Sequence, residues 1–178
     1  MPISRRYELL GWASKGEGRY IIEDDYDSEL RLGGKPIPTL QSIDISEKVI
    51  YMNTFTKTLA STVRISYMIL PRPLLEQFYQ KLSFYSCTVS NFEQYTLDLF
   101  IKEGYFEKHI NRLRNYYQNK KNGFLSAIWD SGLHKCVEIS GEEAGVHFLM
   151  KLKTEKAEEN VIELAKAQGI KLSPLSKF

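Results

Sequence analysis

Charged and hydroxyl side chains stand at the ends of apolar, strand-like segments. The first segment, residues 20–22, leads directly into Glu23-Asp24-Asp25-Tyr26-Asp27-Ser28-Glu29. The second, residues 49–53, leads into Thr54-Phe55-Thr56-Lys57. A third, residues 64–70, begins with an arginine and is stopped by a proline. Because open α/β sheets bind ligands at strand ends, these segments offer carboxylates, a phenol, an amine, hydroxyls and a guanidinium to one site.

These groups match the requirements of pyridoxal phosphate (PLP). A lysine with an ordinary pKa of about 10 is protonated at neutral pH, so Schiff-base chemistry needs a site that lowers its pKa. The pyridine nitrogen needs a carboxylate partner, because the protonated ring is the electron sink. The phosphate needs hydroxyls and a bidentate cation, which Thr54, Thr56 and Arg64 can supply. The inventory therefore predicts a PLP site.

Three stretches, taken in order, carry a resemblance to a known family. They are Glu23-Asp24-Asp25-Tyr26-Asp27-Ser28-Glu29, Thr54-Phe55-Thr56-Lys57-Thr58-Leu59 and Arg64-Ile65-Ser66-Tyr67. Together they resemble the aminotransferase-like domain of MocR-type transcriptional regulators, a branch of the GntR family with a fold type I PLP domain. The resemblance runs over almost the whole chain but covers only the C-terminal portion of that domain.

The resemblance implies a role for each candidate residue. Lys57 is the Schiff-base lysine and the candidate catalytic residue. Asp24 pairs with the pyridine nitrogen, and Tyr26 reaches the phenolic oxygen of the cofactor. The phosphate is held by Thr54, Thr56 and Arg64. Asn53 is a departure, because family members often have glycine there.

Simpler interpretations of the same residues exist. An acidic run at a strand end is also typical of a solvated turn, and a lysine beside threonines is typical of a surface lysine. Thr54-Phe55-Thr56-Lys57 superficially resembles the Ser-x-x-Lys motif of acyl-transferring serine enzymes, but threonine replaces the nucleophile and no Ser-Asp-Asn or Lys-Thr-Gly partner follows.

Composition places the chain among ordinary globular proteins. Its 178 residues are 43% hydrophobic and 26% charged, with a net charge of +2, and no basic cluster points to nucleic-acid binding. Cys87 and Cys136 are too few and too separated for a disulfide framework or a zinc site, so we expect a cytoplasmic protein without a metal. No apolar run approaches the roughly 18 residues of a membrane span, so we expect no membrane association.

The order of elements predicts an α/β protein. It comprises a partial PLP-dependent transferase (aminotransferase fold type I) large domain plus a small α+β C-terminal domain. Three parts are expected: a partial PLP-binding domain over 1–72 with an incomplete, mainly parallel sheet, connecting helices over 73–114, and the small domain over 115–178.

Periodicity and turn residues predict individual elements of these parts. They are a glycine- and proline-rich loop over 32–46, a long helix over 105–128, strands at 135–139, 146–152 and 170–172, and a helix over 155–168. Ser90-x-x-Glu93 predicts a helix start, and Gly104 predicts the end of that helix.

The portion resembled lacks several parts of the family's PLP domain. The glycine-containing phosphate turn, the aromatic ring that stacks on the pyridine and the arginine for a substrate carboxylate are not in this chain. We therefore expect weak or absent PLP binding, held mainly by Lys57, Asp24, Tyr26 and Arg64, and no turnover by this chain alone.

The functional hypothesis is a fragment of the PLP-binding effector domain of a MocR/GntR-type regulator, with Lys57 as the Schiff-base lysine. Its expected partners are PLP and an amine or amino-acid effector in the full-length protein. DNA is expected to bind only through an N-terminal winged-helix domain that this chain does not contain. The incomplete sheet predicts a homodimer. The alternatives are a fragment of a stand-alone class I/II aminotransferase and a non-catalytic dimerising remnant.

Overall fold

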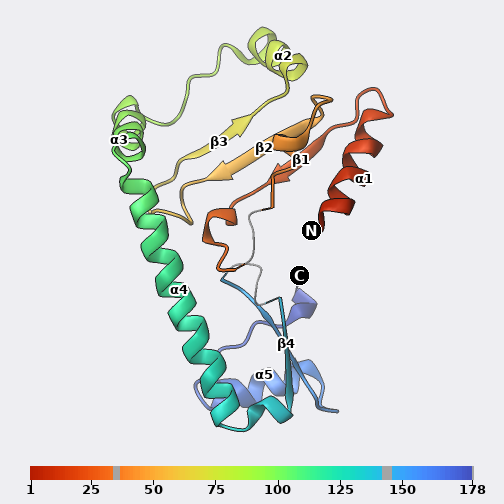
Figure 1. Cartoon of the computed structure of the whole chain (residues 1–178), viewed down its shortest axis with the longest axis vertical. Coiled ribbons are helices and arrows are strands. Elements are labelled where there is room, and N and C mark those ends of the chain that lie inside the picture. Colours follow the sequence, from red (N-terminus) through yellow and green to blue (C-terminus); the bar gives the residue numbers. More distant parts are fainter. Residues whose placement is uncertain (34–36, 142–145, 178) are drawn as a thin grey trace.

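A computed structural model describes residues 1–33, 37–141 and 146–177, so Gly34 and Pro36 of the predicted loop lie outside the described residues. A three-stranded sheet with helices occupies one end of the molecule, and a two-stranded sheet with one helix occupies the other (Figure 1). The long helix α4, Tyr105–Asp130, runs between the two ends. The α/β fold predicted from the sequence is confirmed.

The larger sheet has the order β1-β2-β3, with β1 at Ile21–Asp24, β2 at Val49–Thr54 and β3 at Ser66–Ile69. Strands β1 and β2 are parallel, whereas β2 and β3 are antiparallel. The expectation of a mainly parallel sheet was therefore wrong. The 24 residues between β1 and β2 leave room for a crossover. The 11 residues between β2 and β3 form a return connection without a helix, and such a connection produces antiparallel neighbours.

Helix α1, Ile3–Ser14, lies beside β1 at the edge of this sheet. The β1–β2 connection contains two short 3-10 helices, η1 (Ser28–Leu30) and η2 (Gln41–Ile43). Ala13 of α1 is fully buried. Trp12 remains half exposed, with the Arg19 guanidinium 5.0 Å from its ring centroid. Helix α1 thus contacts β1 along a narrow strip.

Two helices follow the sheet: α2, Arg72–Leu82, and α3, Asn91–Lys102. The predicted capping box is confirmed, because Ser90 Oγ accepts a hydrogen bond from Glu93 N and donates one of 2.9 Å to Glu93 Oε2. Gly104 follows α3 with φ of 72°, a left-handed conformation that favours glycine, and α4 begins at the next residue. Neither α2 nor α3 contains a buried residue.

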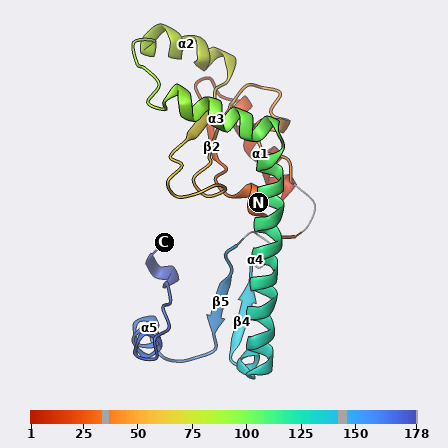
Figure 2. The same cartoon turned by 90° about the vertical axis from the view of Figure 1, so that its left-hand side faces the viewer.

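The other end of the molecule is built on the lower half of α4. Strands β4, Val137–Ser140, and β5, Leu149–Leu152, pair antiparallel, and Figure 2 shows them at the same end of the molecule as the C-terminal half of α4. Helix α5, Glu158–Ala167, follows, with 3-10 helices η3 (Leu133–Lys135) and η4 (Leu175–Lys177) flanking this region.

Two strand predictions in this region differ from the structure. β5 begins at Leu149, three residues later than expected, and residues 170–172 form no strand. The amide of Ile170 instead donates to the carbonyl of Ala165 beside Gly169, whose φ is 75°. This bond closes the C-terminus of α5, so the amide is not available to a sheet.

Buried apolar residues form two separate groups along the chain. Those near the larger sheet are Ala13, Leu30, Leu40, Val49, Tyr51 and Ile110, and those near the smaller sheet are Ile128 and Val137. The division at residues 72 and 114 stays a prediction, and the second boundary falls inside α4. Among the described residues, no helix has both the length and the hydrophobicity to cross a membrane.

Candidate functional site

Sheet topology brings the six predicted site residues to one edge. Because β1 and β2 are parallel, their C-terminal residues Asp24 and Thr54 lie at the same edge. Strand β3 runs the other way, and its first residue, Ser66, is paired with Thr54. Tyr26 follows β1, Thr56 and Lys57 follow β2, and Arg64 precedes β3, so all of them extend from this edge. It is the type of edge at which α/β sheets bind ligands.

The turn that carries Lys57 is held by hydrogen bonds on both sides. Phe55 N donates to Ile65 O at 2.9 Å, and Leu59 N donates to Phe55 O at 2.8 Å. Thr58 is 1% exposed and anchors the turn to the protein interior. Lys57 itself is exposed. The lysine side chain is therefore exposed on a turn whose backbone is held by hydrogen bonds.

The two threonine hydroxyls are already engaged. Thr54 Oγ1 lies 3.0 Å from Thr56 Oγ1 and 3.2 Å from Ile65 O, and Thr56 Oγ1 donates to Val63 O at 2.9 Å. A threonine hydroxyl has one hydrogen to donate. Each threonine would therefore have to exchange an internal hydrogen bond in order to donate to a phosphate, whereas the exposed Arg64 needs no such exchange.

The acidic residues of the first stretch have different surroundings. Glu23 accepts hydrogen bonds from the amides of Leu40 and Gln41 at 2.8 and 3.0 Å, and it forms an ion pair of 3.1 Å with Arg6. Asp24, the next residue, is exposed. Glu23 therefore holds the β1–β2 connection, and Asp24 is available to a ligand.

A polar cluster that is buried at Tyr51 and Asn53 lies on the opposite face of β2 from Met52, and sequence reasoning missed it. We define the Tyr51 cluster as Asp25, Glu29, Tyr51, Asn53 and Tyr67. Tyr51 donates to Asp25 Oδ2 at 2.9 Å, and Asn53 Nδ2 donates to Tyr51 Oη at 3.0 Å and to Glu29 Oε1 at 2.9 Å. The i, i+2 spacing of Tyr51 and Asn53 was the available signal, because it places both on one face of the strand.

Burial controls the ionisation of the phenols in this cluster. Burial is the largest cause that raises the pKa of the Tyr51 phenol well above its ordinary value, and Asp25 raises it further, while the hydrogen bond from Asn53 lowers it. Burial also raises the pKa of Tyr67. Both phenols are therefore neutral in the folded protein at physiological pH.

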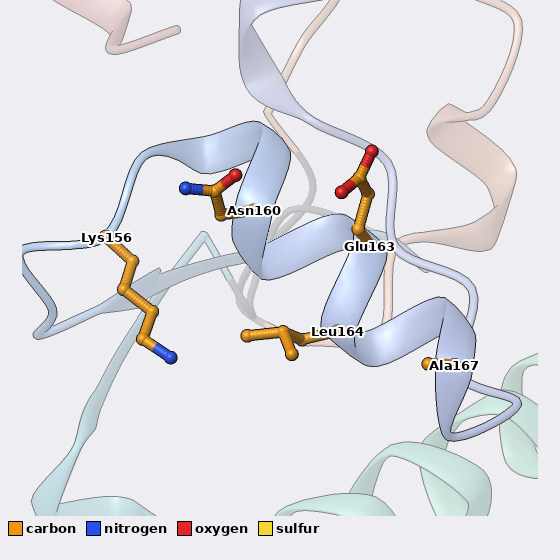
Figure 3. A pocket seen from close by; sticks show the side chains of 5 residues that line it. All are labelled: Lys156, Asn160, Glu163, Leu164 and Ala167. Atoms are coloured by element: carbon orange, nitrogen blue, oxygen red, sulfur yellow. The ribbon is translucent and has the colours of Figure 1, made fainter.

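Two surface cavities lie away from this edge. One, of about 440 Å³, lies beside α5, where four lining side chains project from the helix and Lys156 from the segment before it (Figure 3). The other, of about 190 Å³, is lined by residues near the start of β2 and the end of β3, including Asp44 and Arg72. None of the six predicted site residues lines either cavity.

Sequence comparisons identify relatives among transcriptional regulators. The chain is 46% identical over 176 residues to the uncharacterised HTH-type transcriptional regulator YdeL of Bacillus subtilis, covering 99% of this chain and 38% of YdeL. It is 36% identical over 177 residues to the probable rhizopine catabolism regulatory protein MocR of Rhizobium meliloti, covering 99% of this chain and 36% of MocR. The chain thus spans less than two fifths of the length of these relatives. No protein-family model matches it.

Structural comparison identifies aminotransferases. The crystal structure of Pyrococcus horikoshii kynurenine aminotransferase, solved in complex with PMP, superposes with a TM-score of 0.80 at 29% identity. The superposition covers 98% of this chain and 43% of that enzyme. The identity of 46% to YdeL and 36% to MocR is higher than the 29% to this enzyme. The chain is therefore homologous over almost its whole length to part of the aminotransferase-like domain of MocR/GntR-type regulators, and its fold is that of the PLP-dependent aminotransferases.

Proposed function

We propose that this chain supplies the lysine side of a PLP-binding effector site, with Lys57 as the residue that joins the cofactor. One observation carries the proposal. Asp24, Lys57 and Arg64 are exposed at the same edge of the sheet, on or next to three different strands. Together they offer the amine, carboxylate and guanidinium that PLP requires.

Each residue has a defined role in this proposal. Bound PLP supplies an aldehyde for a Schiff base and a pyridine ring that acts as an electron sink. The amine of Lys57 would be the nucleophile, and the carboxylate of Asp24 would keep the ring nitrogen protonated. Tyr26 would be the partner of the phenolic oxygen, and Arg64 would bind the phosphate with Thr54 and Thr56 as secondary donors. Because those two hydroxyls must exchange internal bonds, we expect weak binding.

Borohydride trapping tests the role of Lys57. PLP is added to the protein, the visible absorbance of the Schiff base is recorded, and the adduct is reduced and located by peptide mass spectrometry. We expect preferential labelling of Lys57 over the other exposed lysines. Lys57→Ala should abolish the absorbance, and Lys171→Ala, which also removes an exposed lysine, should leave it unchanged. Equal labelling of surface lysines, or an unchanged Lys57→Ala spectrum, would exclude the proposed site.

We propose that the full-length protein is a transcriptional regulator, as its relatives are named. In this proposal an amine or amino-acid effector acts at the PLP site, and a separate winged-helix domain binds DNA. The coding sequence before Met1 tests this. A winged-helix sequence there supports the proposal, and the first half of an aminotransferase instead indicates an enzyme. An in-frame stop codon indicates a non-catalytic remnant.

We further propose that the chain associates with a second copy. Its accessible surface is 13,709 Å², whereas a compact monomer of this mass exposes about 8,900 Å². Part of this surface lies on and between α2 and α3, where Phe84, Phe92 and Tyr95 are 74, 81 and 74% exposed. Aromatic surface of this extent is typical of an interface.

Sedimentation velocity at tens of micromolar tests the association. We expect a dimer that the paired substitution Phe92→Ser and Tyr95→Ser weakens. The pair Leu164→Ser and Ile170→Ser removes apolar side chains that are 53 and 56% exposed at the other end of the molecule and serves as the control. A stable monomer, or equal weakening by both pairs, contradicts an interface at α2 and α3.

A further inference from the structure

We propose that Glu29 is a positioning residue that couples the turn carrying Lys57 to helix α4. The inference rests on the proposed function only where it concerns cofactor binding. Glu29 belongs to η1, and its side chain and its backbone bond to different parts of the protein. It is therefore a direct connection between the candidate site and the helix that runs to the other end of the molecule (Figure 1).

The first link is between Glu29 and β2. Asn53 Nδ2 donates a hydrogen bond of 2.9 Å to Glu29 Oε1. Asn53 is 4% exposed, and its own Oδ1 accepts from the amide of Thr54, the last residue of β2 before the turn. A displacement of Glu29 therefore acts on the backbone that leads into Lys57.

The second link is between Glu29 and α4. Arg114 Nε donates a hydrogen bond of 2.6 Å to the main-chain oxygen of Glu29, across 85 residues of sequence. Arg114 lies one helical turn beyond the buried Ile110, and α4 contacts η1. A change in the direction of α4 therefore moves Arg114 relative to the sheet, and the bond to the Glu29 carbonyl displaces η1 with it.

The carboxylate of Glu29 is only partly hydrogen-bonded. Its Oε2 is buried and has no hydrogen-bond partner among the described residues. An unpaired buried carboxylate oxygen is unfavourable, so a small rotation that gives Oε2 a donor competes with the present arrangement. Tyr67 of the same cluster is neutral and carries a hydroxyl hydrogen, whereas the hydroxyl hydrogen of Tyr51 is already donated to Asp25. Two arrangements of one hydrogen-bonded cluster are the kind of element through which binding at one site shifts the position of another.

Hydrogen–deuterium exchange tests the link without any cofactor. Arg114→Ala removes the bond to the Glu29 carbonyl from an exposed position, so the fold is expected to persist. Amides of residues 54–59 should exchange about fivefold faster, the factor for loss of one ordinary hydrogen bond. Arg114→Lys keeps a donor and should restore most of the protection. Arg112→Ala, exposed on the same helix, is the matched control. Unchanged exchange at 54–59 in Arg114→Ala, or an equal effect of Arg112→Ala, overturns the proposal.

A double-mutant cycle and a labelling assay complete the test. If Glu29 is the connection, Asn53→Ala and Arg114→Ala are non-additive in the exchange of residues 54–59, and additive effects overturn the proposal. If Asn53→Ala does not fold, the comparison of Arg114 and Arg112 decides alone. Arg114→Ala should also slow borohydride trapping of PLP on Lys57 severalfold without changing labelling of surface lysines. If wild-type Lys57 is not selectively labelled, the proposed function fails, while the exchange result still decides the link.

Discussion

The hydroxyl of Tyr51 donates a hydrogen bond of 2.9 Å to Oδ2 of Asp25 and thereby joins β2 to the residue that follows β1. Asp25 N also donates to Met52 O at 2.9 Å, so side chain and backbone bind the same two segments. These bonds continue the parallel pairing of β1 and β2 past Asp24. The contacts that hold this edge of the sheet in place therefore include polar groups, and ionisation of the Tyr51 phenol would weaken them.

The raised pKa of Tyr51 predicts alkaline destabilisation. In the unfolded chain the phenol ionises at a pH of about 10, whereas in the folded protein burial keeps it protonated to higher pH. The stabilisation is therefore fully present below about pH 10 and is lost as the pH rises further. We expect the free energy of unfolding to fall by up to about 1.4 kcal/mol per pH unit above that value. Urea unfolding between pH 8 and pH 11 measures it.

Tyr51→Phe is the control for this pH dependence. It removes the titrating group and should reduce the slope above about pH 10. Tyr67, whose pKa burial also raises, should leave a smaller residual slope. An unchanged slope in Tyr51→Phe would show that another group causes the alkaline loss.

The adjacent carboxylates Asp24 and Asp25 should respond differently to substitution. Asp24 is exposed, so Asp24→Ala should leave stability within about 0.5 kcal/mol of wild type. It should weaken the visible PLP absorbance, because the pyridine nitrogen loses its partner. Asp25→Ala removes the acceptor of Tyr51 and Ser28 and should cost about 1–3 kcal/mol. Thermal unfolding and PLP titration of both variants separate the two roles, and similar profiles for both would contradict this assignment.

The ion pair of Arg6 and Glu23 should contribute strongly to stability. The two side chains are only 13 and 10% exposed, and Glu23 also accepts two backbone amides. Glu23→Ala should cost about 3 kcal/mol or more, because it leaves a charge and two amides without their acceptor in a buried environment. Glu8→Ala breaks the exposed Arg5–Glu8 pair and should cost under about 1 kcal/mol. Urea midpoints compare the two, and equal losses would contradict the role given to Glu23.

Two glycines of the α3–α4 region should respond with opposite signs. Gly104 has φ of 72°, so Gly104→Ala should destabilise by about 1–2 kcal/mol. Gly123 lies within α4, where an added methyl group would meet no neighbouring atom within 4 Å, so Gly123→Ala should stabilise by up to about 1 kcal/mol. Thermal unfolding of the two variants measures both shifts. A loss of stability in Gly123→Ala would indicate a role for that glycine outside helix propensity.

Local sequence signals predicted the elements that depend on neighbouring residues. The spacing of apolar residues predicted α4, and Ser90 with Glu93 predicted the start of α3, because both signals act within one or two helical turns. The turn between β2 and β3 that carries Lys57 was predicted for the same reason.

Contacts between distant segments were not predictable in this way. Glu23 is bonded to residues 17 and 18 positions away, and Asn53 to one 24 positions away. Which acidic residue is structural and which is exposed depends on these partners and not on the acidic run itself. The direction of β3 relative to β2 likewise depends on how the β2–β3 connection returns to the sheet.

Helix α4 contributes one buried residue to each end of the molecule, Ile110 and Ile128. They are 18 residues apart, which is about 27 Å of helix. Between them, α4 contributes no buried residue, and its contacts there include the Arg114 bond to the Glu29 carbonyl and the ring of Phe124, whose centroid lies 5.4 Å from that of Phe148. Because these contacts are few, we expect the two ends to open as partly separate cooperative units, with α4 fraying from whichever end opens first.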